Sequence, residues 1–380
     1  MKNPFQLIGK SEAEALEKFR SHFQKLFFGD AEKECVCFST NSLRYIVDIG
    51  HQDIRSEGMS YGMYIAAKLG EENLFESLWQ FSKNYLQNSS GNYAPYFAWQ
   101  VGLPNSKHSD FYKMDPGAAP DGEEYFAAAL LLAAKKFQKP AYKKEACELL
   151  QAMAHKIPAG NVRAMFDESR AAVRFSPMTG NDFTDPSYHT LFFYRLFAEE
   201  TGDKFWEAVY AESIHFLKHA MHPETGLAAD YTEFNGEPKA TNFNPMSHYF
   251  SGDSWRVVLN LALDFSSEIS KPAENICQNA KDFEQKICRK YLQFFRSQKT
   301  VFADYQIDGT PAPNARELTT GLMAMNAAAT CALDINNSDD AELARYFLQK
   351  LWETPTPTGT WRYYDGMLLL LAYCLLTSKF

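Results

Sequence analysis

The sequence predicts an all-α fold, specifically an (α/α)6 barrel of six inner and six outer helices. Apolar residues recur at helical spacing in twelve segments that are distributed over the 380 residues. The connections between these segments alternate between short and long, which favours helical hairpins arranged in a ring. The segments that follow the long connections are also the most apolar, as expected of helices inside a barrel.

The twelve helices can be placed in chain order. The first is expected over residues 11–28, because Ser11 and Glu14 have the spacing of a capping box. The other helices are expected at residues 59–69, 73–87, 122–137, 140–155, 186–201, 203–219, 252–266, 272–296, 317–333, 339–352 and 364–377. Short connections fall near residues 70–72, 138–139, 202, 267–271 and 334–338. Long connections fall near residues 29–58, 88–121, 156–185, 220–251, 297–316 and 353–363.

Two segments illustrate the difference between inner and outer helices. Residues 125–132 are hydrophobic all round, whereas residues 143–150 carry a charged stripe. An open solenoid of helical hairpins is the structural alternative, but the repeats share no residue signature and their long loops differ greatly. No low-complexity linker interrupts the chain, so a single catalytic domain over residues 1–380 is expected.

Composition and charge exclude several classes of protein. A net charge of −9 argues against nucleic acid or an anionic membrane surface as partner. No apolar run reaches the roughly 18 residues that a membrane span needs, and the N-terminus lacks the apolar region of a secretory signal. The seven cysteines include no CxxC pair, which suits free thiols in a reducing compartment. We therefore expect a cytoplasmic protein, and a monomer.

The sequence gives no indication of a metal site or a cofactor. The nine histidines show no compact ligand spacing such as HExxH. Residues 304–309 resemble the start of a calcium loop but lack the acidic positions that should follow, so a turn is expected there. We therefore expect neither a metal nor a cofactor.

Acidic residues stand where the long connections enter the apolar helices. Since all of these connections lead into the N-terminal ends of inner helices, the acidic side chains should meet on one face of the barrel. Each alone could simply cap its helix, whereas several in one cleft favour chemistry. They are Glu57, Asp121 with Glu123 and Glu124, Asp182 with Asp185, and Asp253.

Aromatic residues accompany the acids in the long connections, in runs at residues 93–99, 186–189, 248–250 and 361–365. Aromatic rings stack on the apolar face of a sugar while carboxylates and arginine take its hydroxyl groups. Phe97 and Phe250 fit the hydrophobic core equally well. Trp99 and Tyr188 have polar neighbours, which favours a binding role for them.

Four motifs together resemble glycoside hydrolase family 8, in order along about residues 45–375. They are Arg55-Ser56-Glu57-Gly58-Met59-Ser60-Tyr61-Gly62, Ala119-Pro120-Asp121-Gly122-Glu123-Glu124-Tyr125, Asp185-Pro186-Ser187-Tyr188 and Ser251-Gly252-Asp253-Ser254-Trp255-Arg256. The resemblance implies an (α/α)6 barrel that cleaves β-1,4-linked polysaccharides with inversion at the anomeric carbon. The likeness is greatest to the reducing-end xylose-releasing exo-oligoxylanases of the family, which implies a xylo-oligosaccharide as the substrate.

The resemblance also implies roles for individual residues. Glu57 is expected to be the general acid and Asp253 the general base, with Asp121 holding the sugar at the −1 subsite and Tyr188 binding the attacking water. A helix N-terminus favours the ionised form of Glu57, so desolvation or the charge of Asp121 must raise its pKa. The expected substrate-binding residues are Trp99, Ser60, Tyr61, Tyr125, Tyr249, Arg256, Arg362, Tyr363 and Tyr364.

Three alternatives remain beside this interpretation. The exo-acting relatives carry a Leu-His-Pro barrier where this chain has Leu318-Thr319-Thr320, so an endo-acting xylanase, glucanase or chitosanase stays open, although exo action is expected. Gly58–Gly62 matches the G-x-S-x-G nucleophile elbow, but no strand is expected before it. A sugar-binding barrel that has lost catalysis is disfavoured, because the three carboxylates are retained.

Overall fold

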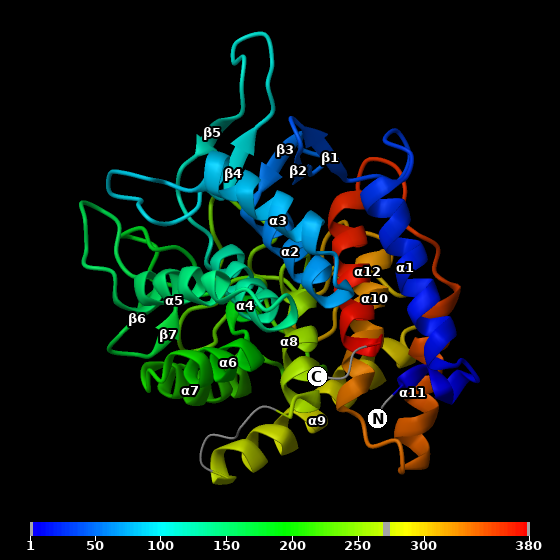
Figure 1. Cartoon of the computed structure of the whole chain (residues 1–380). Helices are drawn as coiled ribbons and strands as arrows, with labels where there is room; N and C mark the ends of the chain where they lie inside the picture. The colour runs from blue at the N-terminus through cyan, green and yellow to red at the C-terminus, as the bar shows by residue number, and fades with distance from the viewer. Residues whose placement is uncertain (1–2, 269–273, 378–380) are drawn as a thin grey trace.

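The computed structural model describes residues 3–268 and 274–377 and confirms the all-α prediction. The helices of these residues are arranged in an inner and an outer layer, as the alternating short and long connections predicted (Figure 1). Their bounds are α1 Glu12–Phe28, α2 Ser56–Leu69, α3 Glu72–Phe81, α4 Pro120–Lys136, α5 Pro140–His155, α6 Leu191–Thr201, α7 Phe205–Ala220, α8 Val257–Ser266, α9 Glu274–Ser297, α10 Thr320–Ala329, α11 Ser338–Glu353 and α12 Arg362–Thr377.

The even-numbered helices form the closed inner ring. Each of α2, α4, α6, α8 and α10 contacts the next one along, and α12 returns to contact α2. The outer helices pack on their partners in the ring: α3 on α2, α5 on α4, α7 on α6, α9 on α8 and α11 on α10. The first helix of the chain, α1, packs on α12 and completes the sixth pair.

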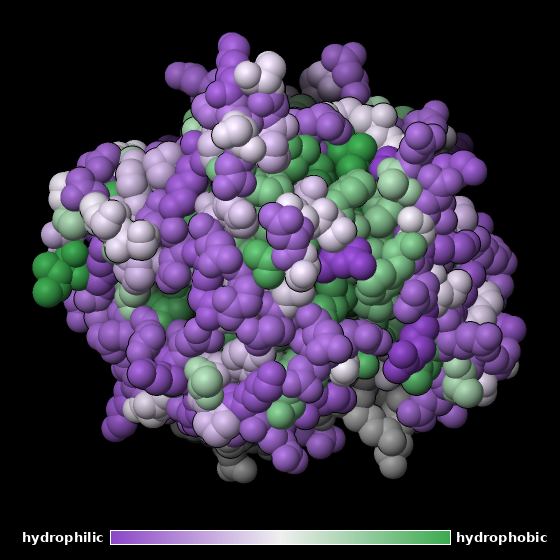
Figure 2. Space-filling view, turned by 45° about the horizontal axis from the view of Figure 1, so that its top comes forward, coloured by the Kyte–Doolittle hydropathy of each residue, from purple (hydrophilic) through white to green (hydrophobic). Residues whose placement is uncertain are grey.

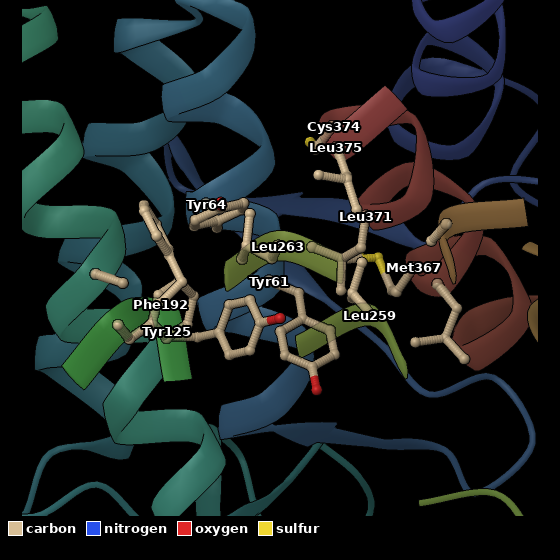
Figure 3. Packing of buried hydrophobic residues seen from close by; sticks show 14 of the residues in the cluster. Tyr61, Tyr64, Tyr125, Phe192, Leu259, Leu263, Met367, Leu371, Cys374 and Leu375 are labelled. Atoms are coloured by element: carbon tan, nitrogen blue, oxygen red, sulfur yellow. The ribbon is translucent and has the colours of Figure 1, made fainter. Parts of the chain in front are cut away.

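Hydrophobic periodicity explains which helices are inside. In α4 the run Ala127–Leu131 is buried on every side, because neighbouring inner helices surround it. In α5 the buried residues Tyr142, Ala146, Leu149 and Met153 form one stripe, and the opposite face meets solvent. Figure 3 shows the result at the barrel centre, where Leu259 of α8, Met367 of α12 and Tyr61 of α2 point toward one another.

The long connections contain short antiparallel strands that the sequence analysis did not predict. The strand β1 (Cys37–Thr40) pairs with β2 (Leu43–Ile46), and β6 (Phe166–Asp167) pairs with β7 (Ala172–Val173). A third sheet has the order β3-β4-β5, with bounds Asp53–Arg55, Gln100–Gly102 and Tyr112–Asp115. Strands of two to four residues are too short to display an alternating pattern, which explains why they were missed.

Several helices begin later or end earlier than expected. The starts expected at residues 186 and 252 are separate 3-10 turns, η3 (Pro186–Tyr188) and η4 (Ser254–Arg256). The helix expected over 317–333 is α10 followed by the 3-10 turn η5 (Thr330–Ala332), and the end of the 73–87 helix is the π-helical turn η2 (Ser82–Leu86). The first two residues of the helix expected over 272–296 lie outside the described residues. Another 3-10 turn, η1 (Pro4–Ile8), precedes α1.

Two further sequence expectations can be compared with the described residues. The six cysteines whose side chains are described are free thiols, and four of them are buried. Within residues 3–268 and 274–377, no helix has the length and apolar character needed to cross a bilayer. The assignment of residues 1–380 to a single domain stays a prediction.

Candidate active site

The predicted catalytic residues lie at or just before the N-terminal ends of four inner helices, and these ends are all at the same end of the barrel. Glu57 lies in the first turn of α2 and Asp121 in the first turn of α4. Tyr188 ends the turn η3 ahead of α6, and Asp253 directly precedes η4 ahead of α8. Figure 2 turns this end toward the viewer and shows hydrophobic residues in a recess bordered by hydrophilic side chains.

Arg256 joins these carboxyl groups. Its side chain is 4% exposed, and Nη1 donates hydrogen bonds to Glu57 Oε2 at 3.0 Å and to Asp121 Oδ2 at 2.7 Å. Nη2 donates to Asp253 Oδ1 at 2.9 Å, and Asp185 Oδ2 lies 4.0 Å away. The structure therefore brings Glu57, Asp121 and Asp253 together around one guanidinium. Arg55 adds a second positive charge that acts on Glu57 and Asp253, so two cations face four carboxyl groups, which favours protonation of part of the cluster.

Glu57 does not cap its helix. The N-cap of α2 is Arg55, which makes no side-chain capping bond, and Glu57 Oε1 instead accepts a hydrogen bond of 2.8 Å from the Tyr363 hydroxyl. Burial raises the pKa of Glu57 to about 7, the negative charge of Asp121 acts in the same direction, and Arg256 opposes both. Desolvation thus outweighs the helix dipole, and Glu57 can hold a proton near neutral pH.

Asp253 occupies a more open position. Its side chain is 31% exposed, against 15% for Glu57, so solvent reaches its carboxylate. Burial raises the pKa of Asp253, and the charge of Arg256 opposes that shift. Because Glu57 and Asp253 bind adjacent nitrogens of one guanidinium, their bonded oxygens lie within the upper limit of about 9.5 Å for inverting pairs.

Asp121 and Tyr188 complete the group around Arg256. Asp121 Oδ1 accepts a hydrogen bond of 2.9 Å from the backbone N–H of Gly122, which fixes the carboxylate against the start of α4. The ring of Tyr188 lies 5.9 Å from the guanidinium carbon of Arg256. Burial and the neighbouring carboxylates hold the pKa of Tyr188 well above its ordinary value, so its hydroxyl keeps its proton.

Most of the predicted aromatic residues also lie around this cluster. The Tyr61 hydroxyl accepts a 2.6 Å bond from Arg256 Nη1, and the ring of Tyr125 meets Tyr61 edge-on at 4.4 Å (Figure 3). The Tyr364 hydroxyl donates to the carbonyl of Gly252, directly before Asp253. The carbonyl of Trp99 accepts from the N–H of Ser56, which ties this indole to the start of α2.

Three expected substrate-binding residues have other contacts. The Ser60 hydroxyl donates to the carbonyl of Glu57 within α2, so its proton is engaged within the helix. The guanidinium of Arg362 donates to backbone carbonyls of Ala31, Cys35 and Gly359. Three of the five N–H donors of Arg362 are thus engaged by the chain, and its role in substrate binding stays a prediction. Tyr249 packs its ring on His248 at 4.0 Å.

Two buried carboxyl groups near Asp253 had no assigned role. Asp230 Oδ1 accepts from the backbone of Ser251 and from both the backbone and hydroxyl of Ser254, at 2.7–3.0 Å. These bonds clamp the turn that carries Asp253. Burial raises the pKa of Asp230 to about 8, with Asp253 adding to the shift. Asp185 caps η3 by accepting from the Ser187 N–H at 2.7 Å, and burial holds its pKa well above the ordinary value.

The structure bears in two ways on the alternative that Gly58–Gly62 is a nucleophile elbow. A three-residue strand, β3, does precede α2, so the expectation that no strand stands there was wrong. Ser60 is nevertheless no nucleophile, since its hydroxyl is bonded to the Glu57 carbonyl within the helix.

The remaining alternative sites have simple structural explanations. Residues 304–309 form a turn, in which Asp304 pairs with Arg316 and Asp308 accepts from the Thr310 N–H. Among residues 3–268 and 274–377, no group of three or more His, Cys, Asp or Glu side chains could hold a metal ion.

A cavity of about 660 Å³ lies at the end of the barrel opposite the carboxylate cluster, where Ser267, Cys331 and Leu375 line it.

Comparison with known proteins identifies the family. The family model of Glycosyl hydrolases family 8 matches residues 40–341. The chain belongs to glycoside hydrolase family 8. It is therefore a glycoside hydrolase, and the fold, the four motifs and the carboxylate cluster agree with that family.

Family 8 relatives match the chain along its whole length. The reducing-end xylose-releasing exo-oligoxylanase Rex8A of Paenibacillus barcinonensis is 32% identical, over 100% of this chain and 95% of the relative. The structure of Rex8A complexed with xylose superposes with a TM-score of 0.85 at 31% identity, covering 99% of this chain and 95% of that one. A family 8 xylobiose complex from Teredinibacter turnerae has a TM-score of 0.87 at 33% identity, covering 99% and 97%.

Proposed function

We propose that this chain hydrolyses β-1,4-xylosidic bonds of xylo-oligosaccharides with inversion and releases xylose from the reducing end. The observation that carries the proposal is the placement of Glu57 and Asp253 on the two terminal nitrogens of Arg256. The full-length similarity to Rex8A, a reducing-end xylose-releasing exo-oligoxylanase, supports the choice of substrate and of the end attacked.

The proposed mechanism divides the work between the two carboxyl groups. Protonated Glu57 gives its proton to the glycosidic oxygen as the bond to the anomeric carbon breaks. Ionised Asp253 takes a proton from a water that attacks this carbon from the opposite face, so the product has the inverted configuration. The proton on Asp253 then returns to solvent, and Glu57 is reprotonated for the next cycle.

The other residues position the sugar and the water. Asp121 accepts hydrogen bonds from hydroxyl groups of the sugar at the −1 subsite. Its negative charge also stabilises the positive charge that develops on this sugar ring in the transition state. The protonated hydroxyl of Tyr188 orients the attacking water. Tyr61 accepts a hydrogen bond from Arg256, and Tyr125 packs on the ring of Tyr61. Trp99 offers a ring for stacking. Tyr363 binds Glu57, and Tyr364 binds the carbonyl that precedes Asp253.

Endo-acting hydrolysis is the second candidate, and the segment Leu318-Thr319-Thr320 supports it. The Thr319 side chain caps α10 by accepting from the Leu322 N–H at 3.2 Å, so its hydroxyl is engaged by the helix. A threonine in this position is too short to obstruct a sugar chain as histidine does. A xylanase of the same family from Teredinibacter turnerae has a structure with xylohexaose and matches with a TM-score of 0.86.

A product profile separates these two modes of attack. Purified enzyme is incubated with xylotriose, with xylotriose reduced to its alditol, and with soluble xylan. Exo action at the reducing end predicts xylose and xylobiose from xylotriose, a large loss of rate on the alditol, and little attack on xylan. A ladder of oligosaccharides from xylan would overturn the exo assignment and leave the endo mode. No cleavage of any xylo-oligosaccharide would overturn the xylosidic substrate.

We also propose that the enzyme is a cytoplasmic monomer that acts on short oligosaccharides without a cofactor. The free thiols of the described cysteines support a reducing compartment. Fractionation of the native host with an antibody tests the location, and light scattering after size exclusion tests the oligomeric state. Recovery of the enzyme outside the cell membrane, or of a stable dimer, would contradict these two statements.

A further inference from the structure

Trp361 is an exposed tryptophan at the catalytic end of the barrel that the proposed mechanism does not use. Its side chain is 67% exposed, although tryptophan side chains are highly buried on average in folded proteins. It directly precedes α12, and two residues further along the Tyr363 hydroxyl binds the acid Glu57. The indole therefore lies on the same face of the molecule as the carboxylate cluster.

The loop that carries Trp361 is firmly held. Arg362 donates to the carbonyls of Ala31, Cys35 and Gly359, at 2.7–3.0 Å. The N–H of Gly359 in turn donates to the carbonyl of Lys33 at 3.0 Å. Backbone on both sides of Trp361 is thus tied to the segment after α1, which explains what Arg362 does. A side chain held exposed in this way loses little conformational entropy when a ligand covers it.

One side of the indole is packed and the other is free. The six-membered ring lies so close to Gly50 that a Cβ atom there would be 2.6 Å from it. The ring of His51 meets the indole edge-on, with centroids 5.8 Å apart. His51 Nδ1 donates to Asp48 at 2.8 Å, which leaves Nε2 of this half-exposed imidazole for another partner.

These contacts continue to Trp99, the predicted stacking residue beside the start of α2. Asp48 also binds Arg55, at 3.2 Å, and the Arg55 guanidinium lies 5.8 Å from the ring of Trp99. The two tryptophans therefore stand at opposite ends of one row of polar side chains, beside the acid Glu57. Such a row has an aromatic ring at each end and polar side chains between them, and both kinds of group bind sugars.

We propose that Trp361 is the platform of an outer sugar subsite, on which the apolar face of a xylose ring stacks while His51 Nε2 binds one of its hydroxyl groups. This inference rests on the proposed function, since it takes the xylo-oligosaccharide as the ligand. A disaccharide that spans the scissile bond occupies the two central subsites, so longer chains are the ones that gain from Trp361.

The test compares substrates of different length. kcat/KM is measured on xylobiose and on xylohexaose for the wild type, W361A and W361F. The ratio of the xylohexaose value to the xylobiose value should fall about two- to tenfold in W361A, and the phenyl ring of W361F should restore most of it. F28A is the matched control, since Phe28 is an exposed aromatic residue on the outer helix α1, and it should leave the ratio unchanged.

Gly50→Ala gives a second test that leaves the tryptophan in place. Its new methyl group should displace the indole, and the ratio should fall as in W361A. An unchanged ratio in W361A, or an equal loss on both substrates, would overturn the inference. If the wild type cleaves no xylo-oligosaccharide, the proposed function fails. The dissociation constant of xylohexaose is then compared between the wild type and W361A by calorimetry, where weaker binding to W361A would still support the platform and equal binding would overturn it.

Discussion

Glu57 and Asp253 share one arginine and yet differ in their surroundings. Glu57 is enclosed between Arg256 and Tyr363, with its side chain 15% exposed and its pKa raised to about 7. Asp253 stands on a 3-10 turn, with 31% of its side chain open to water. The shielded group can hold a proton and the open group can meet the attacking water. Environment, and not residue type, therefore separates the proposed acid from the proposed base.

The largest expected effect separates the two carboxyl groups by their substrates. E57Q and D253N should each lower kcat on xylotriose by about 10²- to 10⁴-fold, because each removes one proton transfer. On β-xylobiosyl fluoride, whose leaving group needs no proton, E57Q should recover most of its activity and D253N should not. Stopped-flow or fluoride-electrode rates check this, with circular dichroism to show that both variants are folded. Equal recovery of both variants would remove the distinction between acid and base.

Removal of the shared cation should shift both groups together. R256Q takes away the charge that lowers the pKa of Glu57 and of Asp253. Both limbs of the kcat/KM profile should therefore move to higher pH, by about 1–3 units, with a loss of rate from the lost orientation. The pH profile of R256K, which keeps the charge, is the control. A profile of R256Q with unmoved limbs would contradict the role assigned to Arg256.

The wild-type pH profile should be bell-shaped. If Glu57 is the general acid, as proposed, it acts in its protonated form, so activity should fall as pH rises through about 7, the raised pKa of this carboxyl. Asp253 acts in its ionised form, so activity should fall again on the acid side as this group takes up a proton. Because the carboxyl groups around Arg256 interact, the apparent pKa of each limb is a property of the whole cluster and not of one residue. Activity that stays constant from pH 6 to pH 9 would contradict a proton-bearing Glu57.

The smallest expected effect concerns the support of the base. D230A leaves the N–H groups of Ser251 and Ser254 without their acceptor, which should lower the free energy of unfolding by about 1–3 kcal/mol. D230N keeps an acceptor oxygen in the same place and should retain most of that stability. Urea unfolding followed by fluorescence gives both values. Equal stability of D230A and the wild type would show that this clamp is dispensable.

The helices could be predicted from sequence because their pattern is long. The periods in α4 and α5 extend over four turns, and both helices were placed within two residues of their bounds. The turns η3 and η4 were merged into the following helices, since three residues with the same apolar spacing look like a first helical turn. Strand β3 was missed because three residues are too short to show an alternating pattern. Its pairing with β4 also depends on residues far along the chain, since Asp53 lies opposite Gly102.

The site was predictable in its residues and less so in its contacts. The motifs and their resemblance to a known family predicted Glu57, Asp121 and Asp253 as site residues. The bond from Arg256 to Glu57 could not be predicted in this way, because it joins positions 199 residues apart. Asp230 gave no signal, because its role depends on the fold of the turn at Ser251 and Ser254. The bonds from Arg362 to the carbonyls of Cys35 and Ala31 were equally hidden, since they join positions 327 and 331 residues apart.

The stereochemistry of the first product tests the central claim most directly. Proton NMR of the anomeric region is recorded within seconds to minutes of adding enzyme to xylotetraose, before mutarotation mixes the anomers. Glu57 and Asp253 acting from opposite faces predict that the newly formed reducing end appears first as the α-anomer. An initial β-anomer would mean retention through a covalent intermediate, and would contradict the acid and base roles assigned to this pair.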